Sequence, residues 1–127
     1  MSDNPGDAVP YSEWAKESVL RAADAANTFG SHLIQHCRQA ALGKLPADAS
    51  PRVREVVESA VDTALHNVCD LLEGFLPTMA GSQNKISYSL VVNVSNLDHS
   101  PVESIPISPS LLDLPIAYWK WRDGDFR

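Results

Sequence analysis

Two histidines spaced four residues apart are the first side chains whose types could do chemistry. His32 and His36 would lie on one side of a helix, and two imidazoles at this spacing can share a metal ion. The glutamate that follows the first histidine in metalloproteases is absent, and a third ligand would have to come from another part of the chain. His36 also falls within an apolar helix face, which favours a packed imidazole. We therefore expect no metal site and no cofactor.

A second group of ionisable residues follows the same four-residue step farther along the chain. Asp62, His66 and Asp70, with Glu73 close behind, could orient an imidazole for acid or base work. No nucleophile accompanies them, and ordinary helices keep such residues on the solvated side, where each pair contributes roughly 0.2–0.5 kcal/mol. If a pocket covered this side, Asp62 and His66 would be the first candidates for a catalytic pair. We lean towards a protein that is not an enzyme.

Aromatic and basic side chains alternate from Tyr118 to Arg122, a pattern found in proteins that bind single-stranded nucleic acid. However, Asp123 and Asp125 follow at once, and 16 Asp and Glu against 10 Lys and Arg give the chain a formal charge of -6. Such a charge repels phosphate backbones and favours basic partners. We therefore expect no nucleic-acid binding and interpret Trp119 and Trp121 as residues of the core or of a protein interface.

Length and composition indicate one domain spanning residues 1–127, of which 44% are hydrophobic. The apolar runs are far shorter than the roughly 20 residues that cross a bilayer, and the opening MSDNPGDAVP lacks the basic start and apolar core of a signal peptide. We expect a cytoplasmic protein that does not bind membranes. Cys37 and Cys69 would lie roughly 20 Å apart in a helical hairpin, so both are expected to be reduced, buried thiols.

The first long helix is predicted over 12–43, after a flexible start at 1–9, with Ser12 as N-cap and Gly43 at its end. Apolar residues at spacings of three and four define its predicted core face: Tyr11, Ala15, Val19, Ala22, Ala26, Phe29, Leu33, Cys37 and Ala40. A thinner second stripe contains Leu20, Ala23, Ile34 and Ala41. Either the rest of the chain or another protomer must cover that stripe.

The second long helix is predicted over 51–74, with Ser50 as its cap and Pro51 in its first turn. Its buried stripe is predicted to be Val53, Val57, Ala60, Val61, Ala64, Leu65, Val68, Leu72 and Phe75. The opposite side is expected to face solvent with mostly acidic residues: Glu55, Ser59, Asp62, His66, Asp70 and Glu73.

Alternating apolar residues predict a strand over 86–94, and the proline-rich residues 95–127 are expected to be irregular and to end in an aromatic tail. Within that region a short edge strand over 102–107 fits the pattern, and 116–122 is ambiguous between helix and strand, with helix slightly favoured. The predicted fold is α+β: an antiparallel helical hairpin packed on a small two- to three-stranded antiparallel sheet. An exposed sheet edge and the two apolar stripes make a homodimer one expected arrangement.

The leading functional hypothesis is a small acidic binding protein of the bacterial immunity-protein or antitoxin type, which presents the carboxylate side of the second helix to a basic protein partner. The expected partner-binding residues are Glu55, Asp62, His66, Asp70, Glu73, Trp119 and Trp121. Two alternatives stay open. One is a small metal-dependent or His/carboxylate enzyme, and the other is a scaffold or accessory subunit anchored by the aromatic C-terminal tail.

Overall fold

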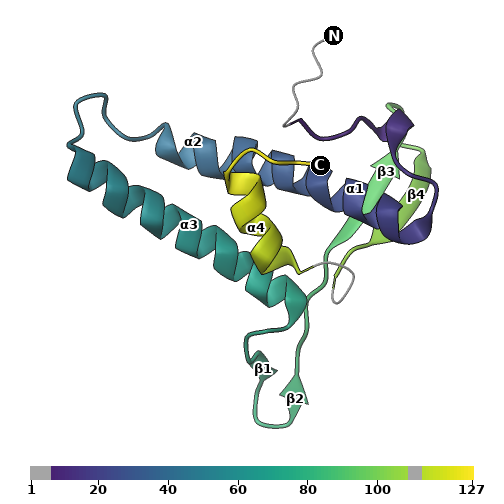
Figure 1. Cartoon of the computed structure of the whole chain (residues 1–127). Coiled ribbons are helices and arrows are strands. Elements are labelled where there is room, and N and C mark those ends of the chain that lie inside the picture. Colours follow the sequence, from purple (N-terminus) through teal and green to yellow (C-terminus); the bar gives the residue numbers. More distant parts are fainter. Residues whose placement is uncertain (1–6, 109–112) are drawn as a thin grey trace.

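The computed structural model describes residues 7–108 and 113–127 and has an α+β fold (Figure 1). A helical hairpin is accompanied, in the part of the chain that the structure describes, by two antiparallel sheets of two strands each. The α+β class and the hairpin predicted from the sequence are therefore confirmed. The expectation that residues 1–9 are flexible falls largely on 1–6, which lie outside the described residues.

The first arm of the hairpin begins later than the sequence predicted. Tyr11–Glu13 form a 3-10 turn, η1, and α1 starts only at Ser18 and runs to His32 (Ser18–His32). The Glu17 side chain accepts a hydrogen bond from the Leu20 N–H and so takes the capping role predicted for Ser12. Trp14 at the end of η1 has an extended backbone, with ψ 140°, which separates the turn from the helix.

A π-helical turn, η2 (Leu33–Arg38), joins α1 to the short α2 (Gln39–Leu42). A π turn contains more residues than an α turn, so the three-and-four spacing loses its phase beyond Leu33. As a result Cys37 and Ala40, both predicted in the core, are exposed, whereas the Arg38 side chain turns towards the second arm of the hairpin. Both cysteines are free, but only Cys69 is buried.

The second arm, α3 (Pro51–Glu73), starts at its predicted cap, because the Ser50 Oγ accepts a hydrogen bond from the Val53 N–H. It ends at Gly74, which adopts the left-handed conformation with φ 75°. Its orientation agrees with the prediction only in part, because Leu65 and Leu72 pack against the core and Glu55 is exposed, whereas other residues depart from the expected pattern. The buried residues are Asp62, Cys69 and Glu73, while much of the predicted buried stripe is exposed, including Val53, Ala60, Ala64, Val68 and Phe75.

Helix α4 (Leu114–Arg122) lies between α1 and α3 in Figure 1 and covers the side of α3 that carries Asp62. Residues 116–122 are thus helical, and Asp113 caps the helix through the Ile116 N–H. Trp121 packs so closely on Gly30 of α1 that a Cβ there would lie 2.2 Å from its ring. The largest fully buried side chains gather around this helix: Trp121, Tyr118, Ile107, Leu114 and Cys69.

Only the second half of the strand predicted over 86–94 forms, as part of β3. The structure places β1 (Met79–Ala80) and β2 (Asn84–Lys85) in a small hairpin beyond α3, and β3 (Val91–Ser95) pairs with β4 (Pro101–Pro106). Residues 86–90 form an extended connection between the two hairpins. Figure 1 shows β3 and β4 beside the start of α1 and the β1–β2 arm projecting away from the helices. Among the described residues, no helix is both long and apolar enough to span a membrane.

Candidate functional site

Asp62, which was expected on the acidic surface of α3, lies in the interior. Asp62 is only 7% exposed, and its Oδ1 accepts hydrogen bonds from Arg38 Nε at 2.7 Å and from the Tyr118 hydroxyl at 2.7 Å. Glu73 is buried as well. The prediction that these two carboxylates face solvent is wrong, because α4 covers this side of α3 and the π turn brings Arg38 across to it.

The pKa values in this cluster follow from its hydrogen bonds. Burial alone would raise the pKa of Asp62, but hydrogen bonds from Arg38 and Tyr118 outweigh it and leave the pKa lowered. Burial and the bond to Asp62 raise the pKa of the Tyr118 phenol. Asp62 therefore stays ionised and joins η2, α3 and α4 through one buried ion pair.

His66, the other half of the predicted catalytic pair, points to a different set of neighbours. Its ring stacks on Trp119 with 5.1 Å between centroids, and its Nδ1 lies 3.5 Å from Asp70 Oδ2. The Arg122 guanidinium also lies over the Trp119 ring, 4.8 Å from its centre. The structure thus brings His66, Asp70 and Trp119 together, and Tyr118 lies between this group and Asp62, since its ring is 6.5 Å from that of His66 and its hydroxyl donates to Asp62.

The two tryptophans of the aromatic tail have different environments. Trp121 is 0% exposed, and its Nε1–H donates to Asn27 Oδ1 at 3.0 Å, so it belongs to the core. Trp119 is 38% exposed. Since Tyr118 is also completely buried, the tail is a structural part of the fold and exposes Trp119 and Ile116 as large apolar side chains. Glu55, near the start of α3, is exposed as predicted, and its binding role stays a prediction.

His32 and His36 are both exposed, and their ring centres lie 5.7 Å apart. No group of three or more His, Cys, Asp or Glu side chains is placed to hold a metal ion in the described ranges. The interpretation of His36 as a core imidazole is wrong, because its position lies inside the π turn, where the apolar face loses its phase.

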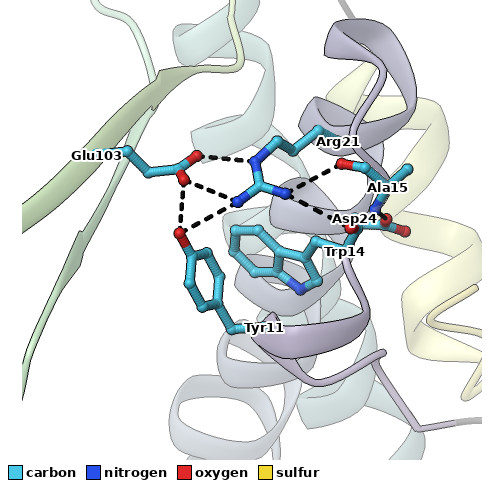
Figure 2. Close-up of polar contacts among 6 residues, drawn as sticks. All are labelled: Tyr11, Trp14, Ala15, Arg21, Asp24 and Glu103. Atoms are coloured by element: carbon cyan, nitrogen blue, oxygen red, sulfur yellow. Dashed lines mark hydrogen bonds and ion pairs between the residues drawn. The ribbon is translucent and has the colours of Figure 1, made fainter.

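A cluster that the sequence did not single out lies at the other end of the molecule and is drawn in Figure 2. Arg21 of α1 donates to both oxygens of Glu103 on β4, at 2.9 Å and 2.7 Å, and to the Ala15 carbonyl at 3.1 Å. The same guanidinium donates to the Tyr11 hydroxyl, which in turn donates to Glu103. One arginine therefore ties η1 and β4 to α1.

These contacts fix the charges of the cluster. Hydrogen bonds from Arg21 and Tyr11 lower the pKa of Glu103 to about 2, and the bond to Glu103 raises the pKa of Tyr11. Trp14 packs edge-on against Tyr11 with centroids 4.9 Å apart and donates its Nε1–H to the Val9 carbonyl at 2.9 Å. The cluster thus holds two aromatic rings of η1 in place beside β3.

Those rings form one wall of a groove between α1 and β3. The groove has a volume of about 410 Å³ and is lined mainly by apolar side chains. From η1 and α1 it is lined by Tyr11, Trp14, Thr28, Phe29 and His32, and from the strand by Leu90 to Ser95. We call it the β3 groove.

The backbone of β3 is available along this groove. The Ile107 N–H donates to the Leu90 carbonyl at 2.8 Å, so Leu90 and Ile107 form a hydrogen-bonded pair. Such pairs alternate along an antiparallel ladder, which directs the N–H and C=O groups of Val91 and Asn93 to the outer edge. Within the described residues, no other strand pairs with that edge.

The outer edge of β4 differs from that of β3. Pro106 stands opposite Val91, at a position whose backbone also points outward, and it has no N–H to offer. Pro101 begins the strand. Prolines on an edge strand discourage pairing with further strands, whereas Val91 to Ser95 contain none. Of the two edges, that of β3 is the one suited to strand addition.

Comparisons of this chain with protein families, with curated proteins and with solved structures find no match. Function must therefore be argued from the site.

Sequence reasoning missed the β3 groove, although two signals pointed to it. Tyr11 and Trp14 stand just before a helix, and a strand without proline pairs with one that begins and ends in proline.

Proposed function

We propose that this chain is a non-catalytic binding protein that takes up an extended segment of a basic protein partner along the outer edge of β3. The observation that carries the proposal is an unpaired strand edge running along an apolar groove. In strand addition, backbone hydrogen bonds provide affinity, and pockets for alternate side chains provide specificity. The outward groups of Val91 and Asn93 supply the first element, and the β3 groove supplies the second.

The walls of the groove indicate what the partner segment contains. Alternate side chains of an added strand would enter the groove and contact Phe29 and Trp14, which favours apolar or aromatic residues at those positions. The remaining side chains would face solvent. The expected partner segment is therefore roughly five to six residues long and alternates apolar with basic residues.

Charge supports a basic partner. The chain has a formal charge of -6, and the exposed Glu13 of η1 and Asp98 of the β3–β4 turn belong to segments adjoining the groove. Hydrogen bonds from Ser100 lower the pKa of Asp98 and keep it ionised. Such charges speed the approach of a basic partner more than they tighten the final complex. Immunity proteins and antitoxins that occupy a basic toxin are one class that would act in this way.

The residues of α3 and α4 that were predicted to bind the partner divide into two groups in this proposal. Asp62, Glu73 and Trp121 are interior, so they contribute to the fold that holds the site. The others keep exposed atoms and can add to long-range attraction: Glu55, His66, Asp70 and Trp119.

Two proline substitutions test the proposal as a matched pair. Asn93→Pro removes an outward N–H from β3, and Ser104→Pro removes the outward N–H of the residue that pairs with it on β4. Each also removes the same hydrogen bond, from the Ser104 hydroxyl to Asn93 Oδ1 at 2.6 Å. Because neither N–H belongs to the β3–β4 ladder, both variants should keep the hairpin. They differ in which edge is blocked, and Asn93→Pro also replaces one side chain of the β3 groove.

Tagged wild-type protein and both variants are used to capture proteins from the native cell at low salt. Synthetic peptides that tile the captured protein are then measured by fluorescence anisotropy. We expect one extended basic peptide to bind wild type and Ser104→Pro alike and Asn93→Pro at least about tenfold more weakly. Equal binding to all three proteins, or loss of binding to both variants, contradicts strand addition at β3.

A further inference from the structure

One side of α3 carries apolar side chains that are exposed to solvent. Leu65 and Leu72 pack against the core, yet other apolar residues of α3 are exposed. The exposed apolar residues are Val53, Val56, Ala60, Ala64 and Val68, and the exposed Phe75 follows the helix end. We call these residues the α3 face. An amphipathic helix normally buries its apolar side, so we expect another surface to pack against the α3 face.

The α3 face continues onto the β1–β2 arm. A hollow of about 310 Å³ lies at their junction and is lined almost entirely by apolar groups: Val68, Leu71, Leu72, Thr78 and Tyr88. Met79 and Ile86 on the arm are exposed too. A two-stranded hairpin is only marginally stable alone, and Figure 1 shows this one projecting from the body of the molecule. Both features fit an arm that rests on another chain.

We propose that two copies of this chain associate through the α3 face, with their α3 helices antiparallel about a twofold axis. This inference goes beyond the proposed function and does not depend on it. In such a pair the N-terminal end of each face, with Val53 and Val56, meets the hollow at the C-terminal end of the other. Ala60 and Ala64 lie near the middle, where small side chains let two helices approach closely.

The size of the surface fits a second copy. Its large side chains are on average about half exposed: Val53, Val56, Val68, Phe75, Met79, Ile86 and Tyr88. With at most about 200 Å² for each fully exposed side chain, they present up to roughly 700 Å² per copy. That upper value exceeds the roughly 300–600 Å² of the largest apolar patch on a typical monomer. Two copies would bury up to roughly 1,400 Å², within the range of stable interfaces, about 1,200–2,000 Å².

Charge fits the same arrangement. Arg52 and Asp70 are separated by five full turns at 3.6 residues per turn and so lie on the same side of α3. A twofold axis that passes between the two α3 helices at the level of Val61 exchanges their ends and keeps the side. Arg52 of one copy then lies beside Asp70 of the other, twice in the dimer, and the antiparallel helix dipoles also attract.

Sedimentation equilibrium of the full chain tests the proposal, with mass read over about 1 µM to 1 mM protein. We expect a species of twice the monomer mass of 13.8 kDa. Ala64→Glu should weaken the dimer at least about a hundredfold, because it buries an unpaired carboxylate. Ala40→Glu adds the same charge at an exposed position on α2 and should change the dissociation constant by less than about twofold. Circular dichroism checks that both variants fold.

A charge exchange tests the orientation of the helices. Arg52→Glu and Asp70→Arg should each weaken the dimer about tenfold, and the double variant should recover most of the loss. A wild-type chain that stays monomeric at about 1 mM overturns the proposal, whatever else covers the face. So does a dimer that Ala64→Glu and Ala40→Glu affect equally. A dimer that Ala64→Glu breaks, but that the double variant does not restore, overturns the antiparallel arrangement.

Discussion

Removing the carboxylate of Asp62 should destabilise the fold, because that group joins three helical segments in the interior. In Asp62→Ala, the Arg38 guanidinium loses its acceptor at 2.7 Å and the Tyr118 hydroxyl loses its only acceptor in the cluster. The Tyr118 residue is 0% exposed and the Arg38 side chain 15%, so water can compensate only in part.

The size of the effect follows from the burial of each partner. Breaking a buried ion pair by removing one member costs about 3–5 kcal/mol. Arg38 keeps Glu58 at 3.7 Å and some contact with solvent, which places the expected loss near the lower end, at about 3 kcal/mol. In a chain of this size such a loss lowers the melting temperature by roughly 10 °C.

Urea unfolding, followed by tryptophan fluorescence and circular dichroism, measures the difference in the free energy of unfolding. Glu55→Ala is the matched control, since Glu55 is an exposed carboxylate on the same helix and should change stability by less than about 0.5 kcal/mol. If Asp62→Ala lowers the free energy of unfolding by less than about 1 kcal/mol, as the control does, the interior role of this carboxylate is refuted. Such a small loss is typical of a carboxylate in a surface ion pair.

Three further measurements test the fold around the site. Gly30→Ala should cost about 1–3 kcal/mol in thermal unfolding, because the new Cβ would lie 2.2 Å from the Trp121 ring, and unchanged stability would mean that α4 packs differently. The stability advantage of wild type over Glu103→Gln should be constant above the ordinary pKa of 4.5 and disappear as the pH falls through about 2, since only an ionised Glu103 accepts both arginine bonds; a pH-independent difference contradicts this. Iodoacetamide should modify Cys37 alone in the native protein, because burial raises the pKa of Cys69 to about 12, and mass spectrometry would reveal equal labelling if that burial were absent.

The sequence was informative about which segments form helices and less so about which way they face. Ser50 and Pro51 predicted the start of α3, and Pro115 agreed with a final helix. The buried side of α3 could not be predicted from periodicity, because a polar side can be buried when arginine and tyrosine partners arrive from distant segments. The apolar stripe indicates that another surface packs against α3. Periodicity does not indicate whether that surface belongs to the same chain or to a second copy.

The π turn explains a second group of errors. Its position is not evident in the sequence, yet it changes which side of the helix the residues after Leu33 face. As a result Cys37 and His36 are exposed. The same change brings Arg38 to Asp62, so this local irregularity affects what the first arm exposes and, together with α4, which side of α3 is buried. π turns are frequent where proteins have specific structural or functional demands.

The two proposed surfaces would act together. A dimer formed through the α3 face would carry two β3 grooves, and a partner with two basic segments could engage both. Linking two binding events in this way raises overall affinity by roughly 10²–10⁴ without new contacts, provided that the spacing allows both to form. A monomeric variant such as Ala64→Glu would then bind a single peptide normally and the intact bivalent partner more weakly.

Amide hydrogen exchange, followed by NMR residue by residue, tests strand addition at β3 most directly. In the free protein the amides of Val91 and Asn93 should exchange quickly, while those of Val92 and Val94, which face β4, should exchange slowly. Adding the captured basic peptide should slow exchange at Val91 and Asn93 specifically. Protection that appears along α3 instead, with these two amides unchanged, would contradict the account and move the binding site to the helix.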